Sequence, residues 1–132
     1  HDILIVSGVF SWLGYLYNIE VDSLFAVSLL TIAGYSVNNT VVVFDRIREK
    51  SLIENQISFK YQIDKAVGAT LTRTLYTSFT TLIPLICILI WGGSTLYWFA
   101  FALLIGVITG SWSSIALAPS LLSITSKKDF IN

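Results

Sequence analysis

A run of eighteen residues without a charge, TLYTSFTTLIPLICILIW at positions 74–91, constrains this chain more than any other feature. A helix needs about 20 apolar residues to cross the roughly 30 Å hydrocarbon layer of a bilayer. Arg73 stands directly before the run. An arginine inside a membrane helix costs about 2.5–3.5 kcal/mol on insertion scales. Arg73 therefore either reaches the membrane surface by snorkelling or has a function within the membrane.

Three further apolar stretches come close to the length that spans a bilayer. The sequence is 55% hydrophobic and only 12% charged, about half the charged share of a soluble domain. The strict alternation that a membrane β-barrel requires is absent. We predict an all-α membrane protein, with one transmembrane domain over residues 1–132. Its bundle of four transmembrane helices is expected at about 3–19, 24–44, 70–91 and 96–124.

The basic residues predict an orientation. Six of the eight Lys and Arg residues lie between positions 45 and 73, and the other two, Lys127 and Lys128, lie in the C-terminal tail. The turns at 18–23 and 92–98 contain neither residue type. Since Lys and Arg are enriched in cytoplasmic loops, we expect a cytoplasmic loop at about 45–69. Apolar residues among its charges predict a surface helix, or continuations of the flanking helices.

Polar residues interrupt the second apolar stretch at Ser36, Asn38, Asn39 and Thr40. Amide side chains are costly in a bilayer unless neighbouring helices hydrogen-bond them. These residues therefore either join helices or line a path for ions or water. The sequence leaves both alternatives open.

The third stretch carries a second polar set, Arg73, Thr77, Thr80 and Thr81. Spacings of four and of seven or eight place these residues on one helix face. Threonine hydroxyls in membrane helices often bond only their own backbone, so they are weak indicators without Arg73. Pro84 removes one backbone hydrogen bond and predicts a kink.

Asn39 and Arg73 are expected at similar depth. Asn39 lies six residues before Asp45, and Arg73 lies nine after Asp64. At 1.5 Å per residue, both lie about 9–13 Å inside the cytoplasmic ends of their helices. Because the two helices run antiparallel, a contact between the two side chains is within reach.

The fourth stretch has small residues at every fourth position. Ala102, Gly106, Gly110, Ser114 and Ala118 form a ridge that lets another helix approach closely. We interpret this ridge as a packing surface and assign it no chemistry.

Motifs of soluble enzymes are absent, and we predict neither an enzyme nor a cofactor. One histidine and one cysteine cannot form a zinc cluster, and no phosphate-binding loop or nucleophile turn is present. The net charge of zero argues against nucleic acid as a partner. Cys87 is expected to be a small buried apolar side chain. A chain that starts at His1 and lacks methionine is expected to be an internal or C-terminal piece.

Four segments resemble SecF, the smaller subunit of the SecDF protein-export complex in the RND superfamily. They are HDILIV (1–6), GYSVNNTVVVFDRIREK (34–50), RTLYTSFTTL (73–82) and FALLIGVITGSWSSIALAPSLL (101–122). The resemblance implies that this chain is the last four of six membrane helices, half of an RND-type membrane domain. The upstream helices and an external domain would lie outside the chain.

The resemblance also implies a function. Proton flow through the membrane part would drive movements that help SecD, the SecYEG channel and the SecA ATPase to move a preprotein across the lipid bilayer. The membrane would be the bacterial inner membrane, or alternatively a thylakoid. The resemblance makes Arg73 the family's arginine linked to proton transport. Asp45, Arg46 and Arg48 would form the cytoplasmic end of the family signature, with a structural role.

Asn39 departs from the family, which has an aspartate at this position, and Tyr76 departs from its more usual small or amide residue. Asparagine does not take up a proton, and arginine does not release one. We expect no acid deep in the helices, because Asp2 and Asp45 stand at helix ends. Our hypothesis is that SecD supplies the proton acceptor and Arg73 holds it ionised. The expected proton pathway consists of Arg73, Asn39, Asn38, Thr40, Thr77 and Thr81.

Two alternatives stay open. The chain could be a non-titrating structural scaffold of the same complex, with Arg73 snorkelling and the asparagines joining helices. It could also be half of another RND-type transporter for small molecules, although such a protein would lack the segment at 34–50.

Overall fold

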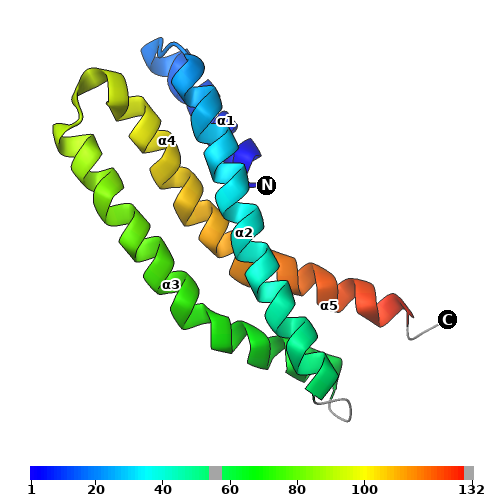
Figure 1. The fold of residues 1–132 in the computed structure, drawn as a ribbon. Helices are drawn as coiled ribbons and strands as arrows, with labels where there is room; N and C mark the ends of the chain where they lie inside the picture. The colour runs from blue at the N-terminus through cyan, green and yellow to red at the C-terminus, as the bar shows by residue number, and fades with distance from the viewer. Residues whose placement is uncertain (54–57, 130–132) are drawn as a thin grey trace.

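The computed structural model describes residues 1–53 and 58–129, with side chains as far as Thr125. This part of the chain is helical apart from short turns (Figure 1). The side chains of Lys127 and Lys128, predicted to be cytoplasmic, lie outside the described residues. The elements are α1 (Asp2–Tyr17), α2 (Ser23–Ile53), α3 (Phe59–Trp91), α4 (Gly93–Trp112), the π-helical segment η1 (Ser113–Leu117) and α5 (Ala118–Asp129).

The all-α membrane-type architecture is confirmed. In the described residues, three helical segments are long and apolar enough to cross a membrane: α2, α3 and the continuous segment Gly93–Thr125. The first helix, α1, has only 16 residues, about 24 Å at 1.5 Å per residue. It packs beside α2 and α4 near the turn that joins α1 to α2 (Figure 1).

The long helices extend past the predicted apolar limits. The second helix runs to Ile53, beyond the expected end near 44, and the third begins at Phe59, before the expected start near 70. Charged residues mark where the apolar part of a helix stops, but Arg, Glu and Lys are themselves good helix formers. Neither glycine nor proline interrupts 45–53. We call this end of the bundle, between Ile53 and Phe59, the loop end.

The opposite end holds two tight connections. After α1, Asn18 adopts the left-handed conformation at φ 53°, as is common after a helix. The carboxylate of Asp22 then accepts a hydrogen bond of 3.1 Å from the Phe25 N–H at the start of α2. Between α3 and α4, Gly93 has φ 73°, which glycine adopts without strain. The predicted turn at 92–98 is therefore much shorter, because α4 already begins at Gly93.

The predicted fourth helix is interrupted. It forms α4, the π-helical segment η1 and α5. In Figure 1, α5 runs away from the other helices toward the C-terminus. Pro119 has no N–H for the Ile115 carbonyl. Just before it, the Ala118 N–H bonds the Ser113 carbonyl five residues back. Proline in a helix commonly causes such a departure from regular geometry. Pro84, in contrast, lies inside one continuous α3.

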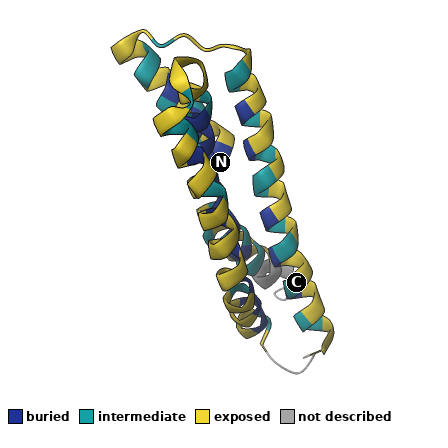
Figure 2. Ribbon diagram, turned by 60° about the vertical axis from the view of Figure 1, so that its left-hand side comes forward, coloured by how far each residue is buried: buried dark blue, intermediate teal, exposed yellow. Residues whose placement is uncertain are grey.

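Two apolar clusters lie along the bundle with polar residues between them. One cluster contains Val6, Phe10 and Ile32 together with residues of α3 and α4. The other, toward the loop end, contains Val43, Ile47, Ile63 and Ala66. Figure 2 shows the buried residues on the helix faces turned toward other helices. The buried polar residues with positions between the clusters include Asp2, Asn39, Thr70, Thr74, Ser78, Ser111 and Ser114. We call this region the polar layer.

The ridge of small residues on α4 and η1 faces α2. Ala102 and Ser114 are fully buried. A Cβ atom at Gly106 would overlap the Ile32 side chain, whereas one at Gly110 would lie at an ordinary 3.6 Å from Ser36 Cβ. The two helices thus approach most closely where α4 has no side chain.

Candidate functional site

Asp2 is the acid of the polar layer. Its residue is 6% exposed, and its Oδ2 accepts a hydrogen bond from Ser36 Oγ. Its Oδ1 lies 2.9 Å from His1 Nδ1. Ser36 lies nine residues before Asp45 on α2, about 13 Å along the helix axis. The expectation that no acid lies deep among the helices is therefore wrong for Asp2. Asp2 is the first residue of α1, but this end of α1 lies against the middle of α2.

Ser114 connects η1 to the same part of α2. Its hydroxyl lies 3.2 Å from Thr40 Oγ1 and also bonds the Gly110 carbonyl at 2.9 Å. Thr40 in turn donates to the Ser36 carbonyl at 2.9 Å. The π-helical segment thus places one hydroxyl against α2 close to the Asp2 site. Irregular helix segments of this kind are frequent at functional sites.

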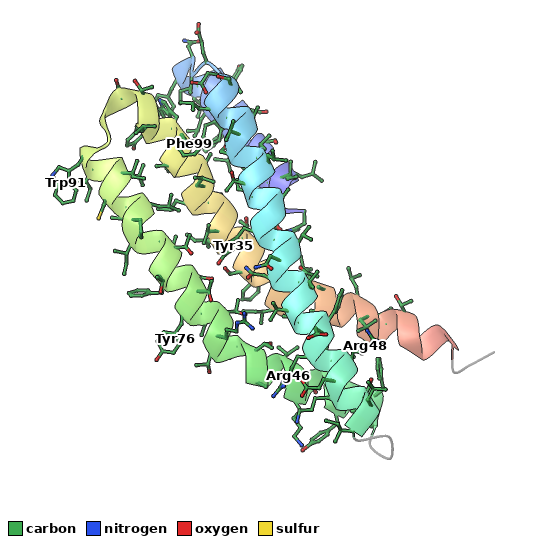
Figure 3. All side chains as sticks on the ribbon, in the orientation of Figure 1. Tyr35, Arg46, Arg48, Tyr76, Trp91 and Phe99 are labelled. Carbon is green, nitrogen blue, oxygen red and sulfur yellow. The ribbon has the colours of Figure 1, made fainter. Side chains whose placement is uncertain are left out.

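A second set of hydroxyls joins α2, α3 and α4. Tyr35 Oη and Ser78 Oγ share a hydrogen bond of 3.0 Å, and Ser78 Oγ also bonds Ser111 Oγ. Each serine hydroxyl also lies within hydrogen-bond distance of a carbonyl of its own helix, 2.8 Å for Ser78 and 2.7 Å for Ser111, so its single hydrogen is shared between alternative acceptors. Figure 3 shows Tyr35 midway along the bundle. These bonds set the relative height of the three long helices.

The two adjacent asparagines have different environments. Asn39 is 7% exposed, and its Nδ2 is buried without a hydrogen-bond partner among the described residues. Asn38 is exposed. Buried polar atoms nearly always have a partner, so the amide of Asn39 is the unusual feature of α2.

Arg73 and Thr77 lie on the outward face of α3, where both are exposed, and Thr81 is half-buried beside them. Thr77 donates to the Arg73 carbonyl at 2.9 Å, and Thr81 donates to the Thr77 carbonyl at 2.8 Å. The Arg73 guanidinium has no partner among the described residues. Tyr76, 72% exposed, points away from the other helices in Figure 3. The outward face therefore offers a positive charge to whatever surrounds this chain.

Arg73 and Asn39 lie at similar heights but face different directions. The Tyr35–Ser78 bond aligns α2 with α3. From there, Arg73 is five residues and Asn39 four residues toward the loop end, about 8 and 6 Å. No hydrogen bond joins the two side chains in the described part of the chain.

The loop end carries the expected charged signature. Asp45 and Arg48 are exposed, and Arg46 is half-buried. Arg46 pairs with Glu49 one turn later, a surface ion pair of the kind that contributes little stability. Figure 3 places Arg46 and Arg48 near the end of α2. Over residues 1–53 and 58–129, no group of three His, Cys, Asp or Glu side chains could hold a metal.

Tyr35, Ser78 and Ser111 were not predicted from the sequence, and Asp2 was expected only as an acid at a helix end. Thr70, Thr74 and Ser78 repeat at every fourth position, the same spacing as Arg73, Thr77 and Thr81. That repeat could have predicted a second row of hydroxyl groups on α3. Cys87, expected to be buried, is exposed on the surface of the chain.

Residues 1–128 match the family described as "Protein export membrane protein SecD/SecF, C-terminal". The chain belongs to this SecD/SecF family. It is 68% identical over 124 residues to the protein translocase subunit SecF of Prochlorococcus marinus, covering 94% of this chain and 39% of the relative. The SecF of a Synechocystis species is 47% identical over 121 residues, covering 92% of this chain and 38% of the relative.

SecDF proteins provide the comparison in three dimensions. A crystal structure of SecDF in its super-membrane-facing form matches with a TM-score of 0.84 and 37% identity. The match covers 98% of this chain and 18% of the SecDF chain. The SecDF of Thermus thermophilus is 39% identical over 122 residues, covering 92% of this chain and 16% of the relative. This chain thus spans about two-fifths of the length of its SecF relatives and less of SecDF.

Proposed function

We propose that this chain is the membrane part of a SecF-type subunit that couples proton movement across the membrane to protein export. Its relatives are named translocase subunits, which supports a non-enzymatic role in export. Its partners would be SecD, the SecYEG channel, SecA and the translocating preprotein. A relative that carries both names, SecDF, supports SecD as the direct neighbour.

The observation that carries this proposal is the exposed guanidinium of Arg73. Its residue lies about 8 Å along α3 from the hydrogen bond between Tyr35 and Ser78. The eighteen residues that follow Arg73 on this helix carry no charge. A charge at such a place is expected to face a partner or a water-filled cavity rather than lipid. Because the described part of this chain offers it no acid, we infer that SecD supplies one.

The mechanism follows from the charges. A carboxylate of SecD beside Arg73 would be held ionised by attraction. A proton arriving at that carboxylate would weaken the pair, and the two subunits would then be free to shift. Arg73 itself would keep its proton throughout. The exposed face of α3, with Arg73, Tyr76 and Thr77, would be the surface that meets SecD.

The membrane arrangement is part of the proposal. We place the loop end with its Lys and Arg residues in the cytoplasm and count α1 as a fourth crossing. The chain would then form half of an RND-type membrane domain. The inner membrane of a bacterium is the expected location, and the cyanobacterial relatives keep a thylakoid membrane as the alternative.

The test replaces Arg73 in the complete subunit, assembled with SecD in inverted membrane vesicles. We expect Arg73→Ala to abolish the part of preprotein export that depends on the proton gradient. Arg73→Lys should also impair it, because an ammonium group cannot pair with a carboxylate through two parallel hydrogen bonds. The matched control is Arg48→Ala, an exposed arginine at the loop end. Unchanged gradient-dependent export in both Arg73 variants would contradict the proposal.

A structural scaffold is the second candidate, and Asn39 is the observation that favours it. An asparagine at the family's aspartate position removes the acid that a proton-coupled SecF would supply itself. Under this alternative, export assisted by the chain would not respond to the proton gradient. Asn39→Asp separates the two, because a newly acquired gradient dependence would identify the natural chain as a scaffold.

A further inference from the structure

We propose that Asp2 is a proton-binding group in the membrane interior and provides within this chain the acid that position 39 lacks. The proposal rests on the proton coupling proposed above and deepens it. It adds a site inside the subunit to the one that SecD would form with Arg73.

Asp2 lies far from the charged end of α2. The Asp2 carboxylate is buried against Ser36, about 13 Å along α2 from the charged residues that begin at Asp45. Acids inside a membrane domain are costly and usually functional. A purely structural contact with Ser36 would be made equally well by an uncharged side chain such as asparagine.

Mostly uncharged groups surround the Asp2 carboxylate. His1 on its own helix lies 2.9 Å from Oδ1 and has a 44% exposed side chain. From α2 comes the Ser36 hydroxyl. Tyr35, the neighbouring residue of α2, lies against Gly110 of α4. From α4 comes the backbone at Gly110, where a Cβ atom would lie 3.8 Å from Oδ2. The residues of α4 and η1 carry no charge.

In the described part of the chain, the ion-pair partner of this carboxylate is His1, whose charge depends on its own protonation. Among the described residues, neither Lys nor Arg forms an ion pair with Asp2. A carboxylate buried without a fixed counter-charge can lose its charge by taking up a proton, which is the usual response of such groups. The step is –COO⁻ plus H⁺ giving –COOH, and the Ser36 hydroxyl serves the ionised form as a donor and the protonated form as an acceptor.

Hydroxyl groups lie next to Ser36 on the side of the loop end. Thr40 and Ser114 lie next to Ser36. Directly after Ser114, Ile115 and Ala116 line a groove of about 440 Å³ between α3 and the η1–α5 segment. Lys60 and Asp64 line the same groove nearer the loop end. On this proposal, a proton released from Asp2 would pass the Thr40 and Ser114 hydroxyls toward the loop end, where this groove lies.

Asn39 carries an unsatisfied hydrogen-bond donor on α2. It lies three residues after Ser36, which places both residues on one side of α2. Its buried Nδ2 has no partner among the described residues. This buried donor, about one turn from Ser36 toward the loop end, is available to donate to a proton-carrying oxygen there, as buried polar groups require.

The experiment uses the complete subunit with SecD in inverted vesicles and measures export with and without a proton gradient. We expect Asp2→Asn to lose the gradient-dependent part and to leave the amount of bound SecD unchanged. Asn39→Asp added to Asp2→Asn should restore part of it. The matched control is Asp22→Asn, an exposed acid at the turn after α1. Full gradient dependence in Asp2→Asn would overturn the proposal.

A direct measurement separates this proposal from the function proposed above. Infrared difference spectra of the purified complex, recorded during a pH titration, should show a protonated-carboxyl band that is missing in Asp2→Asn. Asp2→Glu should move the band and covers the case in which Asp2→Asn does not assemble. If wild-type export ignores the gradient but the band titrates, the proposed function fails and proton binding by Asp2 stands. A wild-type complex without a titrating band overturns the proposal.

Discussion

The inward and outward faces of α3 carry similar residues but use them differently. On the inward face, Ser78 bonds Tyr35 of α2 and Ser111 of α4. On the outward face, Thr77 bonds only the carbonyl of Arg73 in its own helix. The direction in which a hydroxyl points thus decides whether it bonds another helix or only a carbonyl of its own helix. The inward polar residues join the helices of the bundle, whereas Thr77 and Thr81 bond only carbonyls of α3.

The largest expected effect on stability comes from adding side-chain volume at a position that faces another helix. Gly106→Ala adds a methyl group that overlaps Ile32, whose side chain is 1% exposed. We expect it to lower the free energy of unfolding by about 1–3 kcal/mol, as overpacking does in closely packed cores. The measurement is SDS-induced unfolding of the complete subunit in mixed micelles, followed by tryptophan fluorescence.

Gly34→Ala is the matched control for this variant. Gly34 lies on an exposed face of α2, and a Cβ atom there meets nothing within 4 Å. Since alanine favours helix over glycine by about 1 kcal/mol, this variant should be neutral or more stable. Equal destabilisation by both variants would show that α4 does not pack on α2 through Gly106.

The second prediction tests the hydroxyls. Ser78→Ala removes two bonds between helices and should cost about 1–2 kcal/mol of unfolding free energy, near the upper end for such bonds in membrane proteins. Thr77→Ala removes only a bond within α3 and should change stability by less than about 0.5 kcal/mol. The same unfolding measurement compares the two. If Thr77→Ala were the more harmful in the isolated subunit, the assignment of inward and outward faces would be wrong.

Much of the fold could be predicted from the sequence, because length and apolarity define membrane helices almost alone. The small-residue ridge around Gly106 was also predictable, because its small residues recur at every fourth position and permit a close approach of another helix. The continuation of α2 and α3 beyond the apolar part was predicted only as one of two alternatives, since charges stop a membrane span without stopping a helix. The break at η1 could have been anticipated from Pro119.

The polar layer was harder to predict. The series Thr70–Thr74–Ser78 and the series Arg73–Thr77–Thr81 have the same spacing, so periodicity alone cannot say which one faces inward. Asp2 was missed because its place in the sequence, at the start of α1, says nothing about which part of α2 that helix end touches. Only tertiary packing brings residue 2 to residue 36.

The smallest expected effect concerns the two asparagines. Asn39→Leu replaces a buried amide whose Nδ2 is unpaired among the described residues by an apolar group of similar size. It should raise the free energy of unfolding of the isolated subunit by up to about 1 kcal/mol, because an unsatisfied buried donor is removed. Asn38→Leu, at an exposed position, should leave stability nearly unchanged.

Stability is measured by SDS-induced unfolding, with gradient-dependent export as the second readout. A stabilised Asn39→Leu variant that no longer supports export would mean that the amide is kept for function. A destabilised one would mean that Asn39 has a hydrogen-bond partner in the intact subunit.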